Sequence, residues 1–102
     1  MLLAIDVGNT NIVLGIFQGD VLTVSWRLAT LRDRTADELR VLVGRLFEEW
    51  GLDMTEVSGV VMASVVPPLT TTVTEMVRGA FHRETLAIDA TNVGIPIDYR
   101  TP

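Results

Sequence analysis

After Met1 the chain reads Leu2-Leu3-Ala4-Ile5-Asp6-Val7-Gly8-Asn9-Thr10-Asn11. Four apolar residues lead directly into an aspartate, and a glycine and three small polar residues follow one position later. A second apolar run starts at once at Ile12 and continues to Phe17. This pattern predicts a buried strand over residues 2–7, a sharp turn, and a second, mostly apolar strand over residues 11–18.

The groups in this turn suit a phosphate ligand with a metal ion better than a protein core. A carboxylate at Asp6 would repel a phosphate, but it can hold a hydrated Mg²⁺ that bridges phosphates. Gly8 permits close backbone approach and unusual dihedral angles, and the N–H groups of residues 8–11 can form an anion-binding nest. Asn9 and Thr10 add short hydrogen-bond donors.

The loop itself contains no cationic side chain. We therefore expect a metal ion, backbone dipoles or an arginine from elsewhere to neutralise the ligand's charge. The plainer alternative is that Asp6 caps a turn while Asn9 and Thr10 close a hairpin. We favour the ligand site because Asp6 lies at a strand's carboxyl end, where ligands bind in α/β sheets.

The next segment predicts a third strand and a helix. Residues 21–28 partly alternate between apolar and polar, which is typical of a strand with one solvent-facing side. Thr35, with Glu38 three positions later, is a capping box that begins a helix. Apolar residues then recur at helical spacing, and Gly51 ends the helix in the left-handed conformation. The predicted inward positions are Leu39, Leu42, Val43, Leu46 and Trp50.

The last part of the chain predicts two βα steps. Residues 57–66 are apolar and β-branched, as in a buried parallel strand. Pro67-Pro68 ends that strand and can begin a helix that runs to about Phe81. Residues 84–89 predict a fifth strand, and residues 92–102 an irregular tail. The predicted inward positions of the second helix are Leu69, Val73, Met76 or Val77, and Ala80.

The element order is thus β-β-β-α-β-α-β, a single α/β domain with a mixed sheet and helices on its faces. This order is that of a ribonuclease-H-like half-domain, the architecture of actin-like ATPases. A chain of 102 residues forms one domain at most.

Composition excludes several classes of protein. The chain has no cysteine, which excludes disulfide scaffolds, cysteine–zinc sites and thiol catalysis. It has eight arginines but no lysine, which excludes a Walker A loop and a kinase fold with a strand-borne lysine. The net charge is −5 without a basic stripe, so we expect no nucleic-acid partner. Apolar runs are too short to span a membrane, and a secretory signal is absent, so we expect a cytoplasmic protein with no membrane partner.

A retroviral-type aspartic protease is a rival that would use the same aspartate. Such proteases are about as long as this chain and carry Asp-Thr-Gly or Asp-Ser-Gly after a strand. Here the middle residue is Val7, which has no hydroxyl to brace the paired loops. The two predicted helices also do not fit an almost all-β protease.

The segment from Met1 to Phe17 resembles the amino terminus of type III pantothenate kinases, a family of the acetate-kinase/heat-shock-70/actin ATPase superfamily. Ser64-Val65-Val66-Pro67 is similar to the family's segment at the end of its fourth strand. The stretch from Gly94 to Pro102 resembles the one that precedes the family's Gly-x-Asp-Arg motif. The resemblance covers essentially the whole chain.

This resemblance implies a function. Members use ATP to phosphorylate pantothenate to 4'-phosphopantothenate, the first step of coenzyme A synthesis. They are cytoplasmic homodimers that need Mg²⁺ and a monovalent cation, K⁺ or NH₄⁺. By resemblance, Asp6 coordinates the metal at the ATP phosphates, and the phosphate loop consists of Gly8, Asn9, Thr10 and Asn11. Tyr99 matches a tyrosine that lines the pantothenate pocket.

The chain also departs from the family in its length. Members are over twice as long, with two similar domains around a cleft, so residues 1–102 correspond to the amino-terminal domain alone. The family's catalytic aspartate, in Gly-x-Asp-Arg, would begin just past Pro102. We expect no catalytic base in this chain and no useful kinase activity from it alone. The alternative is a non-catalytic relative, either a nucleotide-binding module or an accessory factor that affects transcription.

Four other features have plainer interpretations. We expect His82, the only histidine, at a helix end facing solvent. Trp26 and Trp50 are expected in the core or an interface, because no basic patch accompanies them. Arg32, Asp33 and Arg34 are interpreted as a solvated polar loop. Three consecutive threonines, 70–72, are expected to cap the second helix, with a role in lining a cleft as the alternative.

Overall fold

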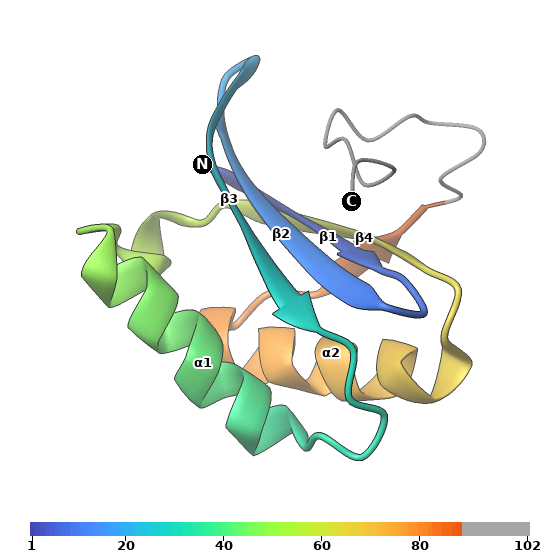
Figure 1. Cartoon of the computed structure of the whole chain (residues 1–102). Helices are drawn as coiled ribbons and strands as arrows, with labels where there is room; N and C mark the ends of the chain where they lie inside the picture. The colour runs from blue at the N-terminus through green and yellow to red at the C-terminus, as the bar shows by residue number, and fades with distance from the viewer. Residues whose placement is uncertain (89–102) are drawn as a thin grey trace.

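The computed structural model describes residues 1–88 as a five-stranded sheet with two long helices (Figure 1). The predicted order of elements is confirmed along this part of the chain. The bounds of the elements are β1 Leu2–Val7, β2 Asn11–Gln18, β3 Val21–Ala29, α1 Ala36–Glu49, the 3₁₀ turn η1 Met54–Glu56, β4 Gly59–Ser64, α2 Pro67–Phe81 and β5 Thr85–Ala87.

The sheet has the strand order β3-β2-β1-β4-β5. β1 pairs antiparallel with β2, and β2 pairs antiparallel with β3, so these three strands form a meander. β1 pairs parallel with β4, and β4 pairs parallel with β5. The central strand β1 therefore ends beside β4, with Val7 opposite Ser64. The sheet is mixed, as predicted.

Both described helices lie on one face of the sheet (Figure 1). The prediction placed helices on its faces without deciding which face each would cover. Because β3 runs parallel to β4, the β3–α1–β4 and β4–α2–β5 connections are two crossovers that move in the same direction across the sheet. Crossovers of this kind share one hand, which brings their helices to the same face.

The main core lies between the sheet and the two helices. It includes Leu3, Ile5 and Val7 from β1, and every one of them is fully buried. A second, smaller cluster occupies the opposite face of the sheet and contains Ala4, Val13, Phe17 and Ala63. Since residues of β2 contribute to both clusters, this mostly apolar strand is buried on both faces.

The ends of α1 follow from its sequence. Thr35 Oγ1 accepts a hydrogen bond from the Glu38 N–H at 3.1 Å, while the Thr35 N–H donates to Glu38 Oε1 at 2.9 Å. This is the predicted capping box. Gly51 has a φ of 66°, the left-handed conformation that a glycine after a helix supplies without strain.

The prediction for the inward face of α1 was wrong at its last position. Trp50 is 58% exposed, whereas Phe47, which the sequence analysis did not assign, is 1% exposed. The ring of Phe47 lies 5.4 Å from that of Trp26 and 5.5 Å from that of Phe81, measured between centroids. Trp50 is the C-cap, whose N–H still donates to the Leu46 carbonyl at 3.2 Å, but Phe47, one turn earlier, already fills the core at this end of α1.

No helix among residues 1–88 is long and apolar enough to cross a membrane.

Candidate functional site

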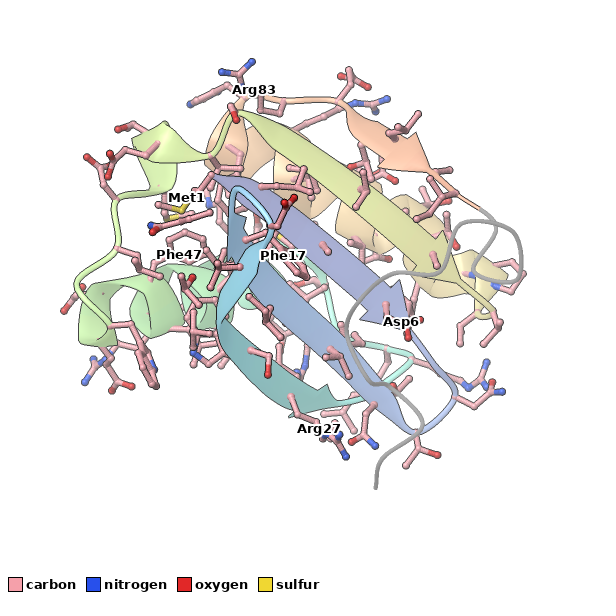
Figure 2. All side chains as sticks on the ribbon, turned by 90° about the horizontal axis from the view of Figure 1, so that it is seen from above. Met1, Asp6, Phe17, Arg27, Phe47 and Arg83 are labelled. Carbon is pink, nitrogen blue, oxygen red and sulfur yellow. The ribbon has the colours of Figure 1, made fainter. Side chains whose placement is uncertain are left out.

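Asp6 lies near the carboxyl end of the central strand β1. This strand has β4 as its parallel neighbour and β2 as its antiparallel neighbour. The cross-strand partners of Asp6 are Val13 on β2 and Ala63 on β4. Since directly paired residues share a face, Asp6 lies on the face of the sheet opposite the helices. Figure 2 shows this face from above, with Asp6 close to the end of β1.

The Asp6 residue is mostly buried, and its carboxylate has no partner among residues 1–88, but the carboxylate oxygens still reach solvent. Only 9% of the residue is exposed. Among residues 1–88, no other charged residue is buried. Within residues 1–88 it accepts no hydrogen bond and forms no ion pair. Burial, which penalises the charged form, raises the pKa of Asp6 above its ordinary value. A mostly buried carboxylate with no cationic side chain beside it is less stable in its charged form, and a bound cation would offset that penalty.

Residues 8–11 form the turn that follows Asp6. The Gly8 N–H donates to the Asn11 carbonyl at 2.9 Å. A Cβ built on Gly8 would lie 3.1 Å from the same oxygen, so a side chain there would crowd the turn. As predicted, the missing side chain of Gly8 allows a close approach of the backbone. Its φ is not positive, however, so the turn does not need a glycine for its dihedral angles.

The expected anion nest over Gly8 to Asn11 needs a correction. The N–H of Gly8 is already bonded to Asn11 and is not available to a ligand. The backbone N–H groups of Asn9 and Thr10, by contrast, donate to no other group in residues 1–88. Both residues are exposed at the tip of the turn. The donors open to an anion are therefore these two N–H groups and the Asn9 and Thr10 side chains.

The segment after β3 holds this turn in place. Thr30 Oγ1 donates to the Gly8 carbonyl at 2.8 Å, and the Thr30 N–H donates to the Thr10 carbonyl at 2.9 Å. Arg32 Nη2 donates to Asn9 Oδ1 at 3.2 Å. Three consecutive loop residues are thus each bonded to the chain around residue 30.

Sequence analysis did not assign a role to Thr30 and placed Arg32 in a solvated loop. The signal that could have found them is the meander. β3 returns antiparallel to β2, so its carboxyl end lies beside the amino end of β2, with Ala29 opposite Asn11. Residues just past β3 must therefore lie next to the loop before β2.

The donor set at Asp6 fits Mg²⁺. This ion binds in proteins through one or two carboxylates, keeps several waters and takes further ligands from substrate phosphates. One mostly buried carboxylate beside exposed N–H and hydroxyl donors has that character. No cluster of three or more His, Cys, Asp or Glu side chains that could enclose a metal occurs in the described residues.

The carboxyl end of the neighbouring strand β4 carries a pair of hydroxyls. Thr70 Oγ1 donates to Ser64 Oγ at 2.8 Å, and Ser64 Oγ accepts from the Val66 N–H at 3.2 Å. The threonines of α2 do not cap it, because Thr70 and Thr72 donate to carbonyls four residues earlier. The expected threonine cap was therefore wrong, and the bond from Thr70 to Ser64 instead joins α2 to β4.

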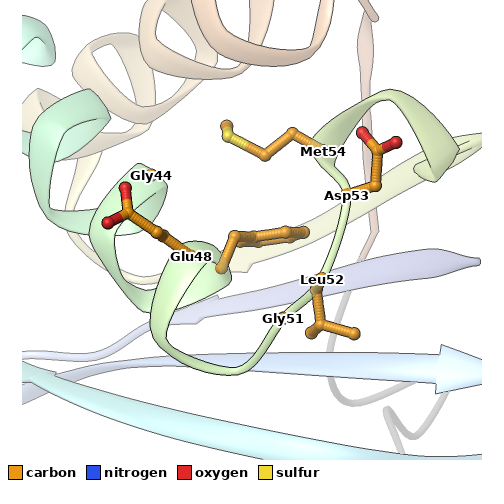
Figure 3. A pocket seen from close by; sticks show the side chains of 7 residues that line it. Gly44, Glu48, Gly51, Leu52, Asp53 and Met54 are labelled. Atoms are coloured by element: carbon orange, nitrogen blue, oxygen red, sulfur yellow. The ribbon is translucent and has the colours of Figure 1, made fainter.

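A hollow of about 490 Å³ lies at the other end of α1 (Figure 3). Phe47, Leu52 and Met54 give it mostly apolar walls, together with Gly44, Glu48, Gly51 and Asp53. Asp53 is already occupied, since its Oδ1 accepts from both the N–H and the hydroxyl of Thr55. The hollow has no polar group directed toward a ligand comparable to Asp6, and we do not assign it as the site.

The remaining predicted residues lie away from the turn. His82 ends α2, is exposed and has a φ of 55°, which agrees with the expected helix-end position. Trp26 is 8% exposed and packs in the main core. Tyr99 and the motif-like stretch from Gly94 to Pro102 lie outside the described residues.

Comparison with known proteins gives a consistent result. The sequence profile of a family described as type III pantothenate kinase matches residues 2–102. A type III pantothenate kinase of Moorella thermoacetica is 50% identical over the whole of this chain, which covers 41% of that protein. A type III pantothenate kinase of Solibacter usitatus is 43% identical over the whole of this chain, which covers 40% of that protein. The chain thus spans about 40% of the length of these relatives.

Solved structures share the fold. A protein described as an N-acetylglucosamine kinase from Porphyromonas gingivalis superposes with a TM-score of 0.62 at 15% identity, over 85% of this chain and 34% of that one. YeaZ from Pseudomonas aeruginosa gives a TM-score of 0.61 at 18% identity, over 86% of this chain and 43% of that one. The predicted α/β fold, a mixed sheet with the order β-β-β-α-β-α-β, is therefore shared with these two solved structures.

Proposed function

Because this chain belongs to the type III pantothenate kinase family, we propose that the complete protein phosphorylates pantothenate with ATP to give 4'-phosphopantothenate. Residues 1–102 would form its amino-terminal ribonuclease-H-like ATPase domain. The observation that carries the proposal is the mostly buried Asp6, whose carboxylate reaches solvent at the base of a turn with exposed donors.

In this proposal each residue of the turn has a separate role. Asp6 would hold Mg²⁺, which when bound would offset the negative charge of the phosphate oxygens. The N–H groups of Asn9 and Thr10 and the Thr10 hydroxyl donate hydrogen bonds to those oxygens. Gly8 keeps the turn tight enough to bring these donors close to Asp6. Asn11 closes the turn through its carbonyl and begins β2.

The reaction is a transfer of the γ-phosphoryl group. The pantothenate hydroxyl oxygen forms a bond to the γ-phosphorus as the bond from that phosphorus to the ADP oxygen breaks, and the hydroxyl proton leaves to a base. Catalysis of this kind rests mainly on positioning and charge stabilisation. The residues of the turn supply both for ATP. By the family resemblance the base belongs to Gly-x-Asp-Arg, and Tyr99 contacts pantothenate.

Further properties of the complete protein follow from family membership. We expect it to require a monovalent cation, K⁺ or NH₄⁺, in addition to Mg²⁺, to act as a homodimer and to reside in the cytoplasm. Sedimentation of the complete gene product and a comparison of turnover in potassium and sodium salts test the first two expectations.

The substrate assignment is tested with the complete gene product that contains residues 1–102. It is incubated with ATP, Mg²⁺ and pantothenate, and the products are separated and identified by mass. The proposal expects phosphopantothenate and ADP in equal amounts. Nucleotide binding without transfer to pantothenate would instead support a binding module of the same fold and would contradict the kinase assignment.

A further inference from the structure

Arg32 brings a positive charge to a turn that has none of its own. It lies in the connection between β3 and α1, with its side chain exposed. Its Nη2 donates to Asn9 Oδ1 at 3.2 Å. Since a guanidinium can only donate hydrogen bonds, the oxygen of the Asn9 amide faces it and the amide nitrogen remains a free donor.

The neighbouring Arg34 has no described side-chain bond to the turn. The positive charge of Arg34 helps to lower the pKa of Glu38, the capping-box carboxylate of α1. Arg32, two residues earlier, contacts only the neutral amide of Asn9 among the described hydrogen bonds. A guanidinium carries five N–H donors in a planar fork. One hydrogen bond to a neutral amide at an exposed site therefore leaves most of these donors available.

The position of Arg32 is fixed by the chain before it. The two bonds from Thr30 to Gly8 and Thr10 tie the start of this connection to the turn. These bonds keep the backbone of residue 32 near the turn, and the bond to Asn9 Oδ1 places the guanidinium at its tip, beside the free donors of Asn9 and Thr10. A guanidinium binds phosphate oxygens through charge-assisted hydrogen bonds that are shorter and stronger than its bond to an amide.

We propose that Arg32 is a phosphate-binding residue of this site. Without nucleotide its guanidinium is hydrogen-bonded to Asn9, and it donates to a terminal phosphate oxygen when ATP binds. The inference depends on the proposed function only in that the site binds a nucleotide phosphate. Arg32 then offsets phosphate charge at the tip of the turn, and its bond to Asn9 Oδ1 leaves the Asn9 amide nitrogen free to donate to the ligand.

The test measures MgATP and AMP binding to the complete gene product by titration calorimetry. Arg32→Ala is expected to raise the Kd for MgATP by about 10- to 100-fold, the loss typical of a hydrogen bond to a charged group. It should change the Kd for AMP much less, because AMP lacks the terminal phosphates. Arg32→Lys should recover part of the affinity, and the Kd of Arg32→Ala should depend less on salt concentration.

Arg34→Ala is the matched control, since it removes the same charge two residues away and should leave the Kd for MgATP within about twofold of wild type. An unchanged Kd for MgATP in Arg32→Ala would overturn the inference while leaving the proposed function intact. An equal loss for MgATP and AMP would also overturn it, because it would indicate a general disturbance of the site. If the wild-type protein binds no nucleotide, the proposed function fails and this inference fails with it.

Discussion

The hydroxyl of Thr30 donates to the carbonyl oxygen of Gly8 at 2.8 Å, across 22 positions of the chain. This bond ties the end of the meander to the turn that follows Asp6. Together with the bond from the Thr30 N–H to the Thr10 carbonyl, it makes the shape of the turn depend on β3. The turn is thus held by tertiary structure as well as by its own sequence.

Thr30→Val tests this dependence, because it removes the hydroxyl and keeps the shape of the side chain. We expect a loss of about 1 kcal/mol in the free energy of unfolding, the net value of one hydrogen bond. Because the turn loses a support, the Kd for MgATP should rise several-fold as well. Thermal unfolding and calorimetry of the complete protein measure the two effects.

Thr23→Val is a control for that variant. Thr23 Oγ1 also donates to a backbone carbonyl, that of Ile16, at 3.0 Å and in a similarly half-buried setting. It lies at the far end of the meander from the turn. A similar stability loss with unchanged MgATP binding is expected. Equal effects of the two variants on MgATP binding would argue against a specific role for Thr30.

Gly8→Ala tests the tightness of the turn. The added Cβ would lie 3.1 Å from the Asn11 carbonyl oxygen, which is backbone and cannot move without opening the turn. We expect both lower stability and weaker MgATP binding. In Gly79→Ala the new Cβ meets only the flexible end of Arg40, at 3.5 Å, and a helical alanine should stabilise the protein by up to about 1 kcal/mol. Thermal unfolding distinguishes the opposite signs.

The raised pKa of Asp6 predicts a dependence of stability on pH. A carboxyl group whose pKa is higher in the folded state binds its proton more tightly there, so its contribution to stability falls as pH rises through that pKa. Without metal, Asp6→Asn should therefore melt at a higher temperature than wild type at pH 7. The difference should narrow as the pH is lowered below the pKa of Asp6. A variant that melts lower at pH 7 would contradict the assignment of burial as the cause.

Phe47 is expected to be the main aromatic anchor of the core. It is 1% exposed and contacts the rings of Trp26 and Phe81. Phe47→Ala should cost about 3–5 kcal/mol in the free energy of unfolding, as for other buried aromatic residues. Trp50→Ala removes a larger but mostly exposed ring and should cost less than about 1 kcal/mol. Denaturant titrations of both variants compare the two positions.

The sequence predicted the strands and helices well because their signals are local. The capping box at Thr35 and Glu38, Gly51 after α1 and the prolines before α2 each act through neighbouring residues. Where a local signal competed with tertiary packing, the prediction failed. Trp50 has the correct spacing for the core, but Phe47, one turn earlier, already fills the place.

The candidate site was predictable in part. Asp6, Asn9 and Thr10 stand in a short stretch whose chemistry is visible in the sequence, and the structure brings them together. The contacts from Thr30 and Arg32 depend on the register of β2 and β3, which sequence patterns do not give. The Gly8 N–H is unavailable to a ligand because it donates to the Asn11 carbonyl. This too depends on turn geometry that the sequence pattern does not give.

The most direct test of the central claim compares wild type and Asp6→Asn in the complete gene product, by the rate of ATP-dependent phosphorylation of pantothenate in the presence of Mg²⁺. Because the carboxylate would hold the ion that offsets the phosphate charge, turnover should fall on the order of 100-fold or more in Asp6→Asn. The circular dichroism spectrum should remain that of the wild type. Wild-type turnover in Asp6→Asn would contradict the account, because Asp6 would then have no part in the phosphate site.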